Sequence, residues 1–194
     1  MRVIFIGTVE FSKKTLEKLI DLNVHVVGVL TKKMSNFNSD FSNITPVCKK
    51  NQIPCKYVKD INSKKNIEWI KSLAPDIIFC FGWSSLIKRE LLNLAPMGVL
   101  GYHPAKLPKN KGRHPLIWTL VLGLKKSAST FFFMDEQADN GNILSQKNFE
   151  ILLTDNAKDL YDKVIKISLM QIEEFIPKLQ NKSYKTIKQN SKLS

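Results

Sequence analysis

The pattern that decides the fold lies in the opening stretch RVIFIGTVEFSKKTLEKLIDLNVHVVGVL, residues 2–30. Its first part, Arg2 to Gly7, is a β-branched and aromatic run ended by a glycine, which is typical of a buried parallel strand. Residues 10–22 then place apolar side chains at helical spacing, with lysines between them. A second apolar run covers residues 24–30. The stretch therefore predicts a strand, a helix and a second strand.

The same alternation continues along the chain. The pattern predicts further strands over residues 54–58, 76–81, 98–103, 127–134 and 143–151. It predicts further helices over residues 45–51, 63–73, 114–123 and 156–180, the last capped by Thr154 or Asp155. Strands that alternate with helices are joined by crossovers, which favour parallel pairing. We therefore expect an α/β fold: a doubly wound, Rossmann-like, mostly parallel sheet with helices on both faces.

The length and composition fit one folded domain. The chain has 194 residues, 43% of them hydrophobic and 24% charged, which excludes collagen-like and globally disordered classes. We expect one domain over residues 1–180. From residue 181 the chain becomes polar and lysine-rich, and residues 181–194 are predicted to be a tail or the start of a missing C-terminal extension.

The charge is strongly positive. Lys and Arg number 30 and Asp and Glu number 17, so the formal net charge is +13. This charge indicates either an anionic partner or a lysine-rich solvated surface. Both remain open, because only Arg2, Arg89 and Arg113 are arginines, the residue that nucleic-acid readers favour for bidentate contacts.

The cysteines and the N-terminus favour a cytoplasmic location. Cys48, Cys55 and Cys80 cannot all pair within one chain and form no C-x-x-C motif, which favours reduced thiols and argues against a zinc site. Met1 runs directly into the first predicted strand, so no signal peptide is expected. No apolar run approaches the roughly 18–20 residues of a membrane span, and no membrane partner is expected.

The turn after the first strand argues against the common dinucleotide-binding and P-loop motifs. Gly7 is the only glycine in the segment Gly7-Thr8-Val9-Glu10-Phe11. A dinucleotide-binding turn needs G-x-G-x-x-G, and a P-loop needs further glycines and a lysine. The segment therefore predicts neither an NAD or FAD site nor a triphosphatase.

Three unusual segments lie where ligands bind in open α/β sheets, at the carboxyl ends of strands. FGWSS at 81–85 follows a strand and is also explained as a turn with Ser84 or Ser85 as a helix N-cap. HPAKLPKNKGRHP at 103–115 is rich in proline, histidine and cationic residues. MDEQADNGNIL at 134–144 is a carboxylate-rich turn, which is also ordinary turn chemistry.

Taken together, these segments resemble the formyltransferase family. That family includes methionyl-tRNA, glycinamide ribonucleotide and sugar-nucleotide formyltransferases, and it uses N10-formyltetrahydrofolate. Its pattern runs approximately N-x-H-P-S-L-L-P, then G-R-x-P, then D-x-G-D-I-L. This chain has GYHPAKLP at 101–108, GRHP at 112–115 and DNGNIL at 139–144. The resemblance extends from the first strand to roughly residue 190 and implies the formyltransferase fold.

The resemblance implies site residues at matching positions. His103 and Asp139 correspond to the catalytic histidine and aspartate, while Gly101 occupies the position of the family's asparagine. A backbone N–H, a water or a neighbouring side chain would then have to replace the asparagine donor. The implied folate contacts are Phe81, Gly82, Trp83, Leu86, Met134 and Asp135. The implied acceptor contacts are Glu10, Lys106, Arg113 and His114. No metal is implied, because the formyl donor is already an activated amide.

The match is greatest to the sugar-nucleotide N-formyltransferases, and among them to enzymes acting on an amino-sugar precursor of pseudaminic acid. It implies N10-formyltetrahydrofolate as co-substrate and a nucleotide-linked amino sugar as acceptor. It also allows a homodimer built through a C-terminal extension. The alternatives are a methionyl-tRNA formyltransferase, a formyltetrahydrofolate hydrolase, and a binding module for folate or nucleotides that has lost catalysis.

Overall fold

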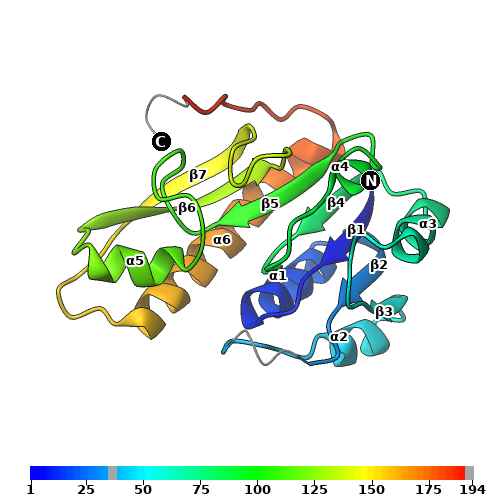
Figure 1. Cartoon of the computed structure of the whole chain (residues 1–194), viewed down its shortest axis with the longest axis horizontal. Helices are drawn as coiled ribbons and strands as arrows, with labels where there is room; N and C mark the ends of the chain where they lie inside the picture. The colour runs from blue at the N-terminus through cyan, green and yellow to red at the C-terminus, as the bar shows by residue number, and fades with distance from the viewer. Residues whose placement is uncertain (35–38, 191–194) are drawn as a thin grey trace. The chain divides into compact units, whose positions relative to one another are not determined.

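The computed structural model describes residues 1–34 and 39–190. The chain divides into two compact units, Met1–Leu100 and Gly101–Ser194. The strands are β1 (Arg2–Ile6), β2 (His25–Thr31), β3 (Cys55–Tyr57), β4 (Ile77–Cys80), β5 (Val99–His103), β6 (Lys126–Phe133) and β7 (Ile143–Glu150) (Figure 1). The helices are α1 (Glu10–Asp21), α2 (Thr45–Lys50), α3 (Lys64–Ser72), α4 (Arg89–Leu92), α5 (Pro115–Val121) and α6 (Ala157–Gln180).

The first unit is a parallel sheet in which β1 is central. Its strand order is β3-β2-β1-β4, followed by the start of β5. Strand β1 pairs in parallel with both β2 and β4, and β2 pairs in parallel with β3. Val3 to Ile6 are fully buried, which explains why this segment lacks the alternation of a half-exposed strand. Strand β4 lies between β1 and β5 in the strand order, and all four of its residues are buried.

The second unit contains the end of β5, followed in strand order by β6 and β7. Strands β6 and β7 form an antiparallel hairpin with a register shift between Phe131 and Phe132. Helix α6 packs on both of these strands, and α5 packs on α6. Leu160 and Val164 of α6 are buried against Phe149 of β7. The chain thus contains parallel strand pairs in the first unit and one antiparallel pair, β6 with β7, in the second. The expected α/β class with mostly parallel strands is confirmed.

Two local expectations need correction. Helix α6 is capped by Asn156 rather than by Thr154 or Asp155, because the Asn156 side chain accepts hydrogen bonds from the N–H groups of Lys158 and Asp159. Neither Ser84 nor Ser85 caps a helix, since the following helix α4 begins only at Arg89. Helix α4 itself was not predicted, because four residues are too few to establish a helical period.

The three cysteines are free thiols. Cys80 lies in β4, and burial raises its pKa to about 12. Cys48 and Cys55 share a hydrogen bond, which raises the pKa of the buried Cys48 and lowers that of the exposed Cys55. Within the described part of the chain, no helix combines the length and the apolar character needed to cross a bilayer.

Candidate active site

The second unit brings together the two residues predicted to form a catalytic pair. His103 is the last residue of β5, and Asp139 lies in the turn between β6 and β7. The Nδ1 atom of His103 is 3.6 Å from Oδ2 of Asp139. The His103 residue is only 5% exposed, so its imidazole is held in a fixed environment. The separation is that of an ion pair and is slightly too long for a direct hydrogen bond.

The other ring nitrogen of His103 makes a hydrogen bond. Its Nε2 atom is 2.7 Å from the carbonyl oxygen of Asn110. A carbonyl oxygen can only accept, so Nε2 carries the hydrogen in this contact. The free lone pair of the neutral ring is then on Nδ1, and a proton taken up there lies beside the Asp139 carboxylate.

Neighbouring side chains hold β5 and the following segment in place. The hydroxyl of Tyr102 lies 2.9 Å from the Ser129 hydroxyl on β6, and burial raises the pKa of Tyr102. Thr130 donates to the carbonyl oxygen of Ala105 at 2.7 Å, and Gln146 donates to that of Leu107 at 3.0 Å. The chain just before and after His103 is therefore fixed to the β6–β7 hairpin.

The segment from Pro104 to His114, which we call the basic loop, returns to the site at its far end. The N–H of Gly112 donates to Oδ2 of Asp139 at 2.9 Å. Gly112 has a φ of 101°, a conformation that residues with a Cβ rarely adopt. The glycine therefore lets the backbone of the basic loop reach the carboxylate that faces His103.

The position of the family's asparagine is filled by other side chains. A Cβ atom on Gly101 would lie 2.7 Å from Cγ and 3.0 Å from Sδ of Met134, and 3.2 Å from Cζ of Phe132. These are the three nearest heavy atoms, and neither side chain has a hydrogen-bond donor. Neither Met134 nor Phe132 therefore replaces the asparagine donor.

The other predicted residues of the second unit surround the same turn and the basic loop. The Asp135 carboxylate accepts hydrogen bonds from the Gln137 N–H at 2.9 Å and from the Asn140 amide at 3.0 Å. Asp135 thus shapes the turn that carries Asp139. The basic loop presents three exposed predicted acceptor contacts: Lys106, Arg113 and His114.

The remaining predicted residues belong to the first unit. The ring of Phe81 is completely buried, and its carbonyl oxygen accepts the Ser12 hydroxyl at 2.6 Å, so Phe81 is a core residue. A Cβ on Gly82 would lie 2.3 Å from Cγ2 of Val9, which shows how tightly the loop after β4 packs on the loop after β1. Leu86 is 62% exposed.

Trp83 and Glu10 offer polar groups in the first unit. The indole Nε1 of Trp83 is buried and has no hydrogen-bond partner among the described residues. The Lys32 ammonium lies 5.0 Å from the centre of the Trp83 ring. Glu10 is the first residue of α1, where the helix dipole stabilises a negative charge. Its Oε1 atom lies 3.8 Å from Nζ of Lys14. Both residues belong to the first unit.

Sequence reasoning missed three contributors to the His103 site: Asn110, the N–H of Gly112, and Gln189. The Gln189 amide donates to the carbonyl oxygens of Asp139 and Gly141. The contacts of Asn110 and Gly112 are made by backbone groups. A glycine at position 112 permits the backbone conformation, but it does not indicate which group its N–H will bind. Gln189 stands in a polar lysine-rich segment, where nothing in the local composition distinguishes it.

Comparison with known proteins places this geometry in context. The family described as "Formyl transferase" matches residues 1–172. The bifunctional polymyxin resistance protein ArnA of Wigglesworthia glossinidia brevipalpis is 33% identical over 94% of this chain and 28% of its own length. The methionyl-tRNA formyltransferase of Kosmotoga olearia is 31% identical over 92% of this chain and 59% of its own length. The chain thus spans less than two thirds of these curated relatives.

A solved structure shares the fold. The structure described as WlaRD, a sugar 3N-formyl transferase with dTDP and 5-N-formyl-THF, has a TM-score of 0.76 and 21% identity. The match covers 98% of this chain and 67% of that chain.

Proposed function

Because this chain belongs to the formyl transferase family, we propose that it moves a formyl group from N10-formyltetrahydrofolate to the primary amine of a nucleotide-linked amino sugar. The observation that carries the proposal is the contact of His103 with Asp139, 3.6 Å apart, at the carboxyl end of β5. A buried imidazole beside a carboxylate is suited to move a proton during acyl transfer.

The reaction needs a neutral amine and a proton acceptor. The amine nitrogen attacks the formyl carbon and gives a tetrahedral intermediate with a negative oxygen and a positive nitrogen. His103 takes the excess proton from that nitrogen, and Asp139 stabilises the imidazolium that results. The bond from the formyl carbon to N10 then breaks, N10 receives a proton, and tetrahydrofolate leaves. In this scheme His103 and Asp139 act as one coupled pair.

The folate proposal rests on one loop in the first unit and one turn in the second. In the first unit, the unpartnered Nε1 of Trp83 is a donor available to a ligand, and the loop around Gly82 is held rigid by its close packing. In the second unit, Met134 and Asp135 stand at the start of the turn that carries Asp139. Phe81 and Leu86 complete the proposed folate contacts, Phe81 by supporting the loop from the core.

The acceptor proposal rests on the basic loop. Lys106, Arg113 and His114 are exposed on it, and cationic side chains such as the first two bind the phosphates of a diphosphate-linked sugar. Glu10 in the first unit is the proposed carboxylate contact of the sugar or its amine. The structure described with dTDP and 5-N-formyl-THF supports this choice, because its fold resembles that of the present chain.

The test is the release of tetrahydrofolate from N10-formyltetrahydrofolate in the presence of a panel of nucleotide-linked amino sugars. We expect His103→Ala to lower kcat by roughly 10²-fold or more, the usual effect of losing a general base. Asp139→Asn is expected to lower kcat as well, because the imidazolium loses its counter-charge. His25→Ala is the matched control, since His25 is exposed and stands at the start of β2. Wild-type turnover in both site variants would refute the assignment.

A second candidate is formyl transfer to methionyl-tRNA. It is favoured by the curated relatives of that name, such as the Kosmotoga olearia protein, and by the net charge of +13. The same assay with charged initiator tRNA decides between the two acceptors. Formate released without any amine would indicate hydrolysis, and folate binding without turnover would indicate a non-catalytic module.

A further inference from the structure

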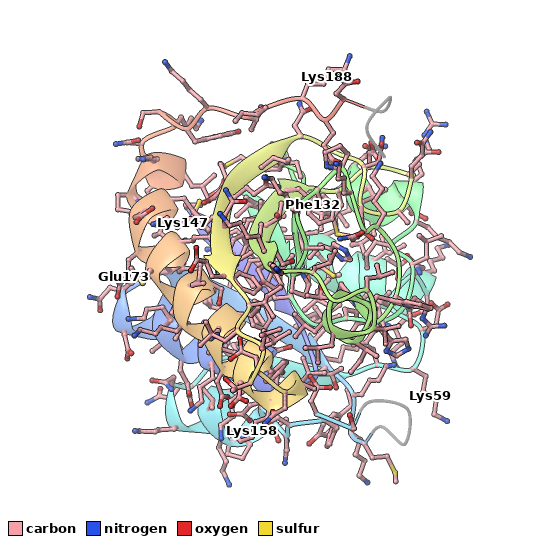
Figure 2. The ribbon with its side chains drawn as sticks, turned by 90° about the vertical axis from the view of Figure 1, so that its left-hand side faces the viewer. Lys59, Phe132, Lys147, Lys158, Glu173 and Lys188 are labelled. Atoms are coloured by element: carbon pink, nitrogen blue, oxygen red, sulfur yellow. The ribbon has the colours of Figure 1, made fainter. Side chains whose placement is uncertain are left out.

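The polar segment after α6 is joined to the hairpin that carries Asp139. Ile187 and Ile143 exchange two backbone hydrogen bonds of 2.8 Å at the start of β7. Two residues further on, Gln189 turns inward and is only 9% exposed, whereas its neighbours Lys188 and Asn190 are exposed. Figure 2 labels Lys188 on the outer surface of this segment. A single inward amide in a lysine-rich segment requires a structural reason.

The amide of Gln189 binds the turn beside the catalytic pair. Its Nε2 donates to the carbonyl oxygen of Asp139 at 3.0 Å and to that of Gly141 at 2.8 Å. Both hydrogens of the NH₂ group are thereby used. The orientation of the amide follows from this chemistry, because its oxygen could not replace the nitrogen against two carbonyl oxygens.

The turn that Gln189 holds has an unusual backbone. Asp139 has a φ of 52°, in the left-handed region, which aspartate and asparagine adopt more readily than most other residues that carry a Cβ. A Cβ on Gly141 would lie 1.6 Å from the Phe133 carbonyl oxygen, so the chain must approach β6 closely there. The turn from Asp139 to Gly141 therefore needs a specific backbone conformation. Gln189 is hydrogen-bonded to the carbonyl oxygens at both of its ends.

The same residue connects the Gln189 amide to the imidazole. The Asp139 backbone oxygen accepts from Gln189, and the Asp139 carboxylate accepts from Gly112 and faces Nδ1 of His103 at 3.6 Å. Rotation of the Asp139 backbone would carry its carboxylate away from the ring. Gln189 lies outside residues 1–172, the part of the chain matched by the family.

We propose that Gln189 is a positioning residue: its amide locks the turn from Asp139 to Gly141 and so keeps the Asp139 carboxylate beside His103. This inference rests on the proposed function, since its consequence is a change in formyl transfer. Gln189 acts through the backbone of Asp139 and needs no contact with either substrate.

The sharpest variant is Gln189→Glu. A glutamate keeps the shape of the side chain, but its carboxylate has no hydrogens and would set negative oxygens against two carbonyl oxygens. We expect kcat to fall about ten-fold or more, the scale on which misplacement of a catalytic group acts, with a much smaller change in the KM for folate. Lys188→Gln is the matched control: it makes the same change of −1 in net charge at the adjacent exposed residue and should keep wild-type kcat. Gln189→Ala removes both hydrogen bonds without placing a negative charge against the carbonyl oxygens. It replaces the glutamate variant in the assay if that variant does not fold.

A double-mutant cycle separates positioning from general stabilisation. If Gln189 acts through the Asp139 carboxylate, Gln189→Ala should reduce kcat much less in the Asp139→Asn background than in the wild type. Equal fold-losses in the two backgrounds would overturn the proposal. A second readout is the ¹⁵N chemical shifts of the His103 ring at fixed pH, assigned by comparison with His103→Ala. In Gln189→Glu they should move towards those of Asp139→Asn, and unchanged shifts would also overturn it.

The outcomes also distinguish this inference from the proposed function. Wild-type formyl transfer in both His103→Ala and Asp139→Asn would refute the function. A large loss in Asp139→Asn together with wild-type kcat in folded Gln189→Glu and Gln189→Ala would refute the positioning role alone.

Discussion

Met134 and Phe132 fill the space that any side chain at position 101 would have to enter. The close distances from the Gly101 Cβ position, 2.7 Å to Met134 Cγ and 3.2 Å to Phe132 Cζ, show that the glycine and its neighbours form one packed unit. Met134 also packs against Leu107 and Ile143 in the core of the second unit. The surrounding side chains therefore leave room for a glycine at the family's asparagine position but not for a larger residue.

This packing predicts the outcome of restoring the asparagine. Gly101→Asn should destabilise the protein by about 1–3 kcal/mol, the usual cost of overpacking, and should not raise kcat. The double variant Gly101→Asn with Met134→Ala makes room for the amide and should recover much of the stability, as measured by denaturant unfolding. Met134→Ala alone is the control. Higher turnover in Gly101→Asn by itself would contradict the packing argument.

At the scale of the element, the start of α6 shows how one helix is anchored. Asn156 and Asp159 form a reciprocal capping box, and Asp155 accepts from the Leu152 N–H at 2.7 Å and pairs with Lys163. The Lys163 ammonium and the Leu152 N–H lower the pKa of the Asp155 carboxyl. Since this helix packs on β6 and β7, its N-terminal anchor supports the hairpin that bears Asp139.

The lowered pKa of Asp155 gives stability a defined pH dependence. A carboxyl whose pKa is lower in the folded state stabilises that state above its unfolded pKa, and the contribution is lost as the pH falls through the folded value. Asp155→Asn should therefore reduce the free energy of unfolding at neutral pH, and its difference from wild type should shrink in acid. Asp162→Asn is the control, because the ion pair of Asp162 with Lys158 is exposed to solvent. A constant difference at all pH values would contradict the ion-pair explanation.

At the scale of the whole molecule, the net charge of +13 acts on any polyanion. Lysine contacts with phosphates release counterions, so such binding weakens steeply with salt and carries little specificity. A small acceptor held in a defined site depends on local contacts instead. The salt dependence of binding should therefore differ between tRNA and a nucleotide-linked sugar.

Under the sugar proposal, binding of non-cognate tRNA should weaken by roughly 10²-fold or more between about 50 mM and about 200 mM salt, whereas formylation of a saturating sugar substrate should change little. Filter binding measures the first and tetrahydrofolate release the second. Selective binding of initiator tRNA that persists at the higher salt would instead favour the second candidate function.

Local sequence patterns predict most of the helices and strands, and motif resemblance predicts the residues of the site. Side chains repeat with a fixed period along a strand or a helix, so the buried face of each element is visible as a local pattern in the sequence. Examples are the buried run Val3–Ile6 and the helical spacing of Leu160 and Val164. Motif resemblance predicts His103 and Asp139 as site residues, and the structure places Nδ1 of His103 3.6 Å from Oδ2 of Asp139. Their roles in formyl transfer remain predictions.

The contacts that hold the site in place become visible only in the folded chain. The Asn110 carbonyl on His103, the Gly112 N–H on Asp139 and the Gln189 amide on the turn are contacts of backbone groups or of polar side chains. Such groups occur throughout the chain, so residue type does not reveal which of them are used. Gln189 and Asp139 are 50 positions apart, and their contact forms because a hairpin and the segment after α6 pair in space. Local periodicity carries no information about pairing at that separation.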